Sequence, residues 1–120
     1  MFDVTVIILT LNEELHIKRC LKNVNLFAKK VYVIDSFSTD NTVGIAKSMG
    51  ATVVQHKWPG NQAEQFNWAL ENIEIDTEWI FRLDADEYLL PELIEELQAK
   101  VPLLDENITG ITFKRRPRNI

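Results

Sequence analysis

Residues 4–13 read Val-Thr-Val-Ile-Ile-Leu-Thr-Leu-Asn-Glu, a strand followed at once by the start of a helix. The first seven of these residues form a nearly continuous β-branched and apolar run, which is typical of a parallel strand covered on both faces. We expect Asn12 to cap the following helix, with Glu13 and Glu14 favourably placed near its positive end. One face of that helix is apolar and is made by Ile17, Cys20, Leu21 and Val24.

The same alternation of apolar strand and amphipathic helix continues along the rest of the chain. Further strands are predicted at residues 31–35, 51–55, 79–83 and 108–113. The helices between them are predicted to begin near Asp40, Asn61 and Pro91. Strands that alternate with helices pair in parallel through crossover connections. The pattern therefore predicts an α/β fold with a mostly parallel sheet flanked by helices.

Length and composition limit the class of protein. The chain has 120 residues, which we treat as one domain, 1–120, and 46% of them are hydrophobic and 26% charged. It contains neither an apolar run of about 18 residues nor a signal peptide, so we expect no membrane span. The single cysteine, Cys20, fits a reducing cytoplasm. The net charge of -5 argues against nucleic acid as the main partner.

Polar residues follow three of the predicted strands, at the edge where parallel α/β sheets bind ligands. Asp84 and Asp86 come directly after the strand at 79–83, so their carboxylates can converge on one point. Hard cations such as Mg²⁺ or Mn²⁺ prefer oxygen ligands and share them with substrate phosphates. This spacing predicts a metal site for a diphosphate, and the alternative is a solvated acidic turn before a helix.

Two other strand ends carry candidate ligand contacts. Asp35 ends a strand, where a carboxylate can accept hydrogen bonds from a nucleotide's ring or ribose, or can cap its own loop. Thr10 and Glu13 border the first strand end, where Glu13 can reach a base. The polar side chains of the loop at residues 36–41 are interpreted as turn-forming residues that hydrogen-bond to their own backbone, with Asp40 capping the next helix.

Several remaining residues have a structural and a functional interpretation. Gln62, Gln65 and Asn67 are expected to face water, with sugar hydroxyls as the alternative. Trp58 is expected to serve mainly in packing, with stacking on a sugar from its loop as the alternative. The basic run at residues 114–118 predicts either a solvated tail or contact with phosphates or an anionic membrane surface.

Three segments together resemble the family 2 glycosyltransferases, which have the Rossmann-like GT-A fold. They are residues 6–13 (VIILTLNE), 33–42 (VIDSFSTDNT) and 83–87 (LDADE), and their order and separation match the family as well. Residues 60–70 (GNQAEQFNWAL) are similar to the segment that precedes the family's acidic motif. The subgroup that looks most similar contains bacterial lipopolysaccharide-core β-glucosyltransferases.

The resemblance implies a nucleotide-sugar site, with UDP as the usual nucleotide. The residues that would border the donor are Thr10, Leu11, Glu13, Asp35, Ser36, Asp84, Ala85 and Asp86. Asp84 and Asp86 would form the family's Asp-x-Asp motif, with Asp86 the expected direct ligand of Mg²⁺ or Mn²⁺. The implied reaction is inverting transfer of a hexose to a glycan or lipid-linked acceptor, at the inner face of the cytoplasmic membrane or in the cytoplasm.

The sequence departs from the family pattern at its end. An inverting enzyme needs a general base, and in the family this carboxylate lies well beyond the acidic motif. No Asp or Glu follows Glu106, so we expect the base and the acceptor-binding part beyond Ile120 and regard the fold as truncated. We expect donor binding with little transfer by this chain alone. Uncovered apolar faces would also favour self-association.

Two other function classes are compatible with parts of the pattern. A phosphatase-like hydrolase would use Asp84 as nucleophile and Asp86 as acid and base, but it needs a downstream lysine and a further acidic pair. A non-catalytic nucleotide-binding module shares every local feature of the transferase. Nucleotide binding without transfer would favour the module.

Overall fold

The computed structural model describes residues 2–87, 89–100 and 113–115. Its strands are β1 (Phe2–Thr10), β2 (Ala28–Asp35), β3 (Thr52–Gln55), β4 (Trp79–Asp84) and β5 (Phe113–Arg115). Its helices are α1 (Glu14–Val24), α2 (Thr42–Ser48), α3 (Gln62–Asn72) and α4 (Pro91–Lys100). Strand and helix alternate through this order, as the sequence predicts.

The five strands form one sheet in the order β3-β2-β1-β4-β5, and the first four are parallel. The chain runs from β1 outward to β2 and β3 and then returns to place β4 on the other side of β1. The topological switch point therefore lies between β1 and β4, where open α/β sheets leave a crevice for ligands.

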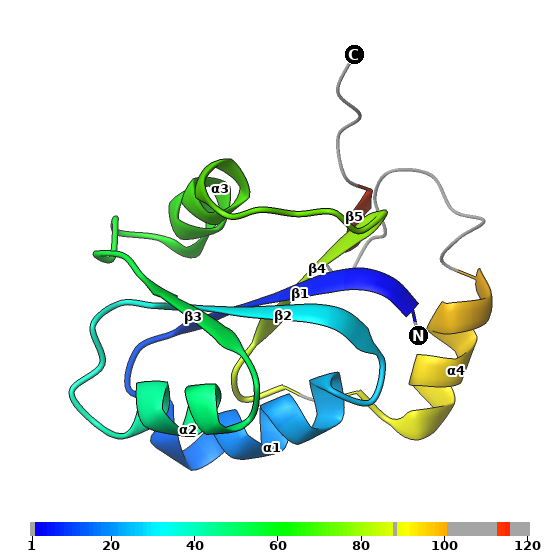
Figure 1. Ribbon diagram of the computed structural model, residues 1–120, viewed down its shortest axis with the longest axis horizontal. Coiled ribbons are helices and arrows are strands. Elements are labelled where there is room, and N and C mark those ends of the chain that lie inside the picture. Colours follow the sequence, from blue (N-terminus) through cyan, green and yellow to red (C-terminus); the bar gives the residue numbers. More distant parts are fainter. Residues whose placement is uncertain (1, 88, 101–112, 116–120) are drawn as a thin grey trace.

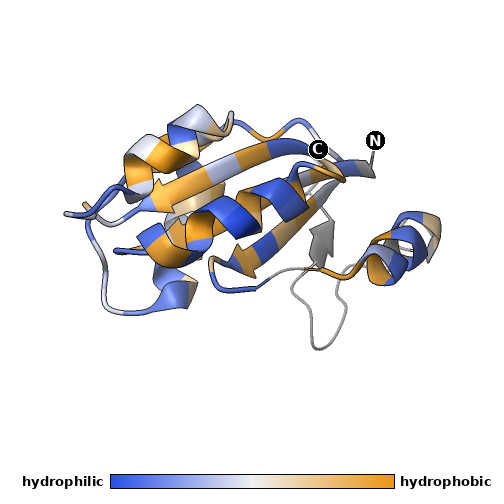
Figure 2. Cartoon of the chain, turned by 90° about the horizontal axis from the view of Figure 1, so that it is seen from below, coloured by the Kyte–Doolittle hydropathy of each residue, from blue (hydrophilic) through white to orange (hydrophobic). Residues whose placement is uncertain are grey.

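Helices cover both faces of the sheet. In Figure 1, α1 and α2 lie below the strands and α3 lies above them. Strand residues alternate between two apolar clusters: Val6 and Ile8 face α1, whereas Ile7 between them packs with Phe66 of α3. Figure 2 shows strands that are mostly hydrophobic between helices that also carry hydrophilic residues. The continuous apolar run in β1 is explained by this burial on both sides.

The fifth strand differs from the prediction. β5 is described over Phe113–Arg115 and pairs antiparallel with β4, whereas the alternation of strands and helices predicted parallel pairing. Residues 108–112, and the basic residues 116–118, lie outside the described residues. Lys114 and Arg115, the first two residues of the basic run, belong to this strand. The free backbone groups along the edge of β4 explain this pairing, and a hydropathy pattern does not record them.

The described helices give no membrane span. None of them, within residues 2–87 and 89–100, has the length and apolar character needed to cross a bilayer.

One side chain of α1 fixes the segment that follows the acidic turn. Asn23 Nδ2 donates to the Leu89 carbonyl at 2.6 Å, and its Oδ1 accepts from the Leu89 N–H at 2.7 Å. We expect Asn23→Ala to lower the free energy of unfolding by about 2 kcal/mol, because both backbone groups lose their partner. Urea unfolding measures the change. Asn67→Ala on the exposed side of α3 is the matched control, and an equal effect of the two changes would contradict this role.

Candidate functional site

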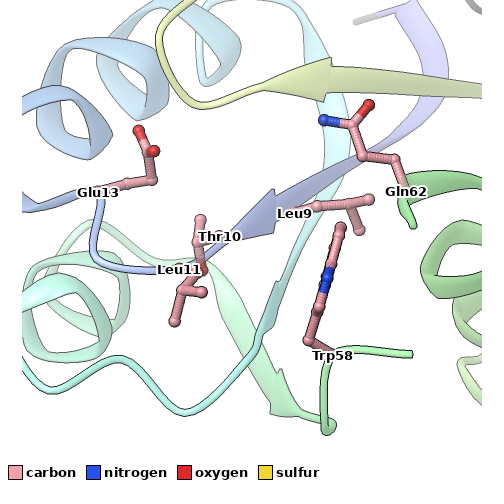
Figure 3. A pocket seen from close by; sticks show the side chains of 6 residues that line it. All are labelled: Leu9, Thr10, Leu11, Glu13, Trp58 and Gln62. Atoms are coloured by element: carbon pink, nitrogen blue, oxygen red, sulfur yellow. The ribbon is translucent and has the colours of Figure 1, made fainter. Parts of the chain in front are cut away.

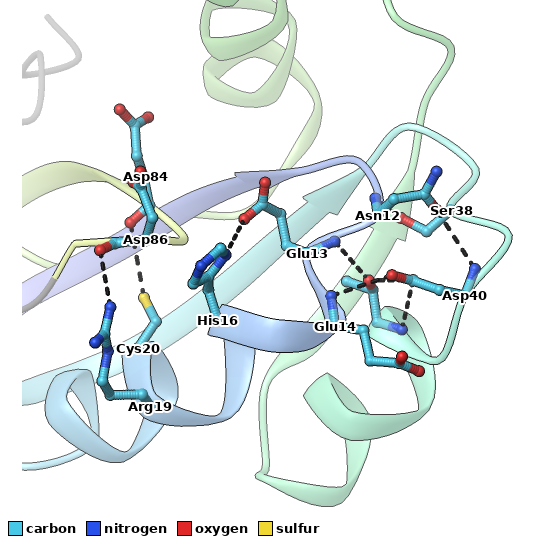
Figure 4. Close-up of polar contacts among 11 residues, drawn as sticks. Asn12, Glu13, Glu14, His16, Arg19, Cys20, Ser38, Asp40, Asp84 and Asp86 are labelled. Carbon is cyan, nitrogen blue, oxygen red and sulfur yellow. Dashed lines mark hydrogen bonds and ion pairs between the residues drawn. The ribbon is translucent and has the colours of Figure 1, made fainter.

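The loops that follow β1 and β2 are joined to each other at the carboxyl edge of the sheet. Asn12 takes a left-handed conformation, with φ of 53°, and its Oδ1 accepts the N–H of Thr39 at 2.8 Å. In return, the Asn12 N–H donates to Ser38 Oγ at 2.8 Å. The prediction that Asn12 caps α1 is therefore wrong. The N-cap residue is Glu13, and the Asn12 side chain bridges to the neighbouring loop (Figure 4).

The N–H groups at the start of α1 are satisfied by side chains of the second loop and of Thr42, the first residue of α2. Thr42 Oγ1 accepts from the Glu13 N–H at 2.9 Å, and Asp40 Oδ2 accepts from the Glu14 N–H at 3.1 Å. Asp40 also accepts from the Thr42 hydroxyl and N–H, and these hydrogen bonds lower the pKa of its carboxyl. Asn41 is the N-cap residue of α2, one position after the predicted one. Asp40 nevertheless serves both helix ends.

Asp35, at the end of β2, is fully buried and holds three strand ends together. Its Oδ1 accepts from Thr10 Oγ1 at 2.7 Å and from Ser38 Oγ at 2.5 Å. Its Oδ2 accepts from the Ser38 N–H at 2.8 Å and from Gln55 Nε2 at 3.3 Å. Burial raises the pKa of this carboxyl, but the hydrogen bonds outweigh burial and the pKa is lowered overall. Asp35 is therefore held as a carboxylate by donors of the protein itself.

A second polar network links Ser36 to α3. Gln65 is fully buried, and its Nε2 donates to Ser36 Oγ at 3.1 Å and to the His56 carbonyl at 3.2 Å. Gln65 Oε1 lies 2.7 Å from His56 Nδ1, and the His56 ring stacks on Trp68 with centroids 3.8 Å apart. The expectation that Gln65 faces water is wrong, whereas Gln62 and Asn67 are exposed. The distant partners of Gln65 left no local signal in the sequence.

The acidic turn after β4 is anchored through its backbone. Arg19 of α1 donates to the Asp86 carbonyl at 3.1 Å, and Cys20 Sγ lies 3.9 Å from the Asp84 carbonyl (Figure 4). Glu87 Oε1 accepts the Asp84 N–H at 3.0 Å. These contacts leave the Asp86 side chain exposed and the Asp84 side chain half-buried, with Ala85 buried between them.

Cys20 belongs to the core rather than to the site. Burial raises the pKa of its thiol to about 12, and the charge of Glu87 adds to this effect. A neutral thiol is a poor metal ligand.

An open cavity of about 360 Å³ adjoins the end of β1. Its lining combines apolar and polar side chains and consists of Leu9, Thr10, Leu11, Glu13, Trp58 and Gln62. Figure 3 shows Glu13 and Gln62 on opposite sides of this space. The volume lies near the lower end of the usual range for small-molecule sites. Three residues predicted from the first strand end therefore share one cavity: Thr10, Leu11 and Glu13.

The chemistry of the acidic turn suits a hard divalent cation. Among the residues described, no three His, Cys, Asp or Glu side chains gather into a metal cage. Two carboxylates on one turn, Asp84 and Asp86, nevertheless match the pattern in which an ion takes one or two protein carboxylates and completes its shell with substrate phosphates and water. The donor set is thus compatible with Mg²⁺ or Mn²⁺ shared with a diphosphate.

Together, the sheet order, the cavity beside β1 and the acidic turn across the switch point define a Rossmann-like α/β protein with the GT-A fold. Residues 5–119 match the family described as Glycosyl transferase family 2, and the chain belongs to this family. An uncharacterized glycosyltransferase of Rickettsia bellii is 38% identical over 95 residues, which cover 79% of this chain. The lipopolysaccharide core biosynthesis glycosyltransferase LpsC of Rhizobium meliloti is 33% identical over 118 residues, covering 92% of this chain and 41% of LpsC.

Solved structures support the same fold. TarS of S. aureus superposes with a TM-score of 0.69 and 25% identity, over 83% of this chain and 32% of that structure. The mannosyltransferase PcManGT of Pyrobaculum calidifontis, solved with GDP-Man and Mn²⁺, has a TM-score of 0.66 and 26% identity, over 80% of this chain and 31% of its own. Glucosyl-3-phosphoglycerate synthase of Mycobacterium tuberculosis, solved with UDP and Mn²⁺, has a TM-score of 0.65 at 18% identity, over 94% of this chain and 56% of its own.

The chain spans about a third of the length of the curated relatives that it matches. The alignment covers 31% of the Rickettsia bellii protein and 32% of the relative from Rickettsia typhi. The matched residues include most of β1, the loops after β1 and β2, and the acidic turn after β4.

Proposed function

We propose that this chain binds the donor of an inverting, metal-dependent glycosyltransferase that moves a hexose from UDP-hexose to a glycan or lipopolysaccharide acceptor. One observation carries the proposal: the acidic turn and the cavity beside β1 flank the same switch point of the sheet. The first offers ligands for an ion and the second offers room for a nucleoside, as a nucleoside diphosphate requires.

Each part of the site has a task in this proposal. Thr10, Leu11 and Glu13 border the nucleoside, and the Glu13 carboxylate accepts a hydrogen bond from the base or ribose. Asp84 and Asp86 hold Mg²⁺ or Mn²⁺, which supplies positive charge to the diphosphate as it leaves. Arg19 holds the backbone of the turn so that both carboxylates keep their direction.

Asp35 and Ser36 act from behind the cavity. Asp35 fixes the Thr10 side chain and therefore the end of β1, which is the wall that the nucleoside meets. Because its oxygens already accept four hydrogen bonds, a base that contacts Asp35 must displace one of these donors. Ser36 directly follows the end of β2, and Gln65 donates a hydrogen bond to its hydroxyl. The general base for the acceptor hydroxyl is assigned to a carboxylate outside these residues.

The hydrolase alternative has no support beyond the acidic turn. Family membership points to transfer rather than to hydrolysis of a phosphate ester. A non-catalytic nucleotide-binding module would bind the same ligand with the same residues. A glycosylated product would show that the protein is a transferase, whereas nucleotide binding without product would favour the non-catalytic module.

Calorimetric titration of UDP into the chain tests the proposal. With Mn²⁺ present we expect saturable binding of one UDP per chain, and with EDTA we expect binding to weaken at least about tenfold, because the diphosphate loses its counter-charge. UMP is the matched control, since it lacks the diphosphate that shares the ion. Equal UDP affinity with Mn²⁺ and with EDTA would contradict the metal-dependent site, and absence of UDP binding by a folded chain would contradict the proposal as a whole.

A further inference from the structure

Trp58 is a large aromatic side chain placed at the surface beside the cavity. It lies in the segment between β3 and α3, and 40% of its surface is exposed. The two other tryptophans are engaged elsewhere, because Trp79 is 1% exposed and Trp68 stacks on His56. Leaving an indole in contact with water has a cost in free energy, and a ligand that covers it regains that cost.

The segment that carries Trp58 is fixed on both sides. Before it, the His56 N–H donates to the Asp35 carbonyl at 2.9 Å, and the His56 ring stacks on Trp68. After it, Asn61 caps α3 by accepting the Glu64 N–H at 2.8 Å. Few residues separate these anchors, so the backbone that carries Trp58 is fixed beside the end of β1 before any ligand arrives.

The opposite side of the cavity carries a second exposed apolar residue. Leu11 follows β1 and is 50% exposed, and both Leu11 and Trp58 line the cavity. In Figure 3, Trp58 stands with Leu9 on one side of the space, and Leu11 lies on the other side with Thr10. A flat indole facing a branched aliphatic side chain suits a planar ring, whereas Glu13 and Gln62 offer polar atoms to the ring edge.

We propose that Trp58 stacks on the nucleobase of the nucleoside diphosphate, with Leu11 contacting the other side of the ring. This inference rests on the proposed donor site and adds a binding residue to it. The volume of about 360 Å³ suits a nucleoside better than a complete nucleotide-sugar. The diphosphate would then extend from the cavity toward the acidic turn.

Binding measurements on Trp58 variants test the stacking. Trp58→Ala is expected to weaken UDP binding about tenfold in the presence of Mn²⁺, because base stacking on an aromatic side chain is lost. Trp58→Phe keeps an aromatic face and should bind UDP within about threefold of the unchanged chain. Pyrophosphate with Mn²⁺ is the second probe. It has no base, so its affinity should be the same for Trp58→Ala as for the unchanged chain.

Tryptophan fluorescence gives an independent readout. UDP should quench the emission of the unchanged chain, and Trp58→Phe should bind UDP without this quenching because the reporting indole is gone. Trp68→Phe should retain the quenching. Three results would overturn the inference: unchanged UDP affinity in Trp58→Ala, persistent quenching in Trp58→Phe, or an equal loss of UDP and pyrophosphate affinity. If pyrophosphate binds with Mn²⁺ and Trp58→Ala leaves UDP affinity unchanged, the stacking fails while the donor site stands; if neither ligand binds, both fail.

Discussion

Asp86→Ala is expected to weaken Mn²⁺-dependent UDP binding by at least about 100-fold, or about 2.8 kcal/mol of binding free energy. The side chain of Asp86 is exposed at the end of the turn, whereas its backbone carbonyl is held by Arg19. Removing the carboxylate therefore deletes a charged oxygen ligand and leaves the backbone of the turn anchored. The ion shared with the diphosphate is lost, and with it the main attraction for the two phosphates.

Isothermal titration of UDP with Mn²⁺ measures this loss, and titration with EDTA measures what remains without the ion. In EDTA, the unchanged chain and Asp86→Ala should bind UDP equally weakly. Glu95→Ala on the exposed face of α4 removes the same charge away from the site and should leave the affinity unchanged. A variant Asp86→Ala that keeps Mn²⁺-dependent binding would refute the assignment of this residue as the direct ligand.

The half-buried Asp84 should respond differently from Asp86. Its N–H is held by Glu87 and its carbonyl lies near Cys20, so its side chain leaves a more constrained point of the turn. Asp84→Asn keeps the shape and removes the charge. We expect it to weaken Mn²⁺-dependent UDP binding about tenfold, less than Asp86→Ala, because an amide oxygen can still act as a weaker oxygen ligand. A larger loss from Asp84→Asn would make Asp84 the main ligand.

Asp35→Ala is expected to lower the free energy of unfolding by about 3 kcal/mol, a large part of the total for a domain of this size. The change leaves donors on Thr10, Ser38 and Gln55 without an acceptor inside the sheet edge. Asp35→Asn is the companion variant for the case in which alanine prevents folding. Its amide group keeps one acceptor oxygen but places N–H groups opposite donors of the protein. Urea unfolding measures both, and Asp76→Ala at an exposed position is the control.

The pH dependence of stability provides a second measurement of the same carboxylate. Hydrogen bonds hold the pKa of Asp35 in the folded chain below its ordinary value of 3.8 despite burial. The stabilisation is therefore fully present above pH 3.8 and is lost as the pH falls through the lower folded value. The stability difference between the unchanged chain and Asp35→Asn should shrink over that window. A constant difference between pH 6 and pH 3 would contradict the assignment.

The strand ends could be predicted from the sequence because burial on both faces leaves a continuous apolar run. The run in β1 ends at Thr10 and β4 ends at Asp84, where each strand reaches the carboxyl edge of the sheet. Glycine commonly follows the end of a helix, and Gly50 lies just beyond α2 with a φ of 88°, so the end of this helix was also predictable. Once four strands were placed in parallel, the meeting of Thr10, Asp35 and Asp84 at one edge followed from topology.

The partners of individual polar side chains could not be predicted in the same way. Asn12 and Gln65 have ordinary local roles available, as a helix cap and as a solvated helix residue. Their observed partners lie 27 and 29 residues away, and only the folded sheet brings them together. The antiparallel pairing of β5 has the same origin, because an open strand edge is a property of the assembled sheet. The role of such a polar side chain is therefore set by hydrogen bonds to residues distant in the sequence, which a single sequence does not reveal.

The bridge between the loops after β1 and β2 has a consequence for protein engineering. Asn12, Glu14 and Asp40 each satisfy backbone groups of the opposite loop. Exchanging only one loop with that of a relative would remove the side-chain acceptors of N–H groups in the other, even if every ligand contact were copied. Chimaeras that alter donor preference should therefore transplant residues 11–14 and 36–42 as a single unit, and natural variation in the two loops should be correlated.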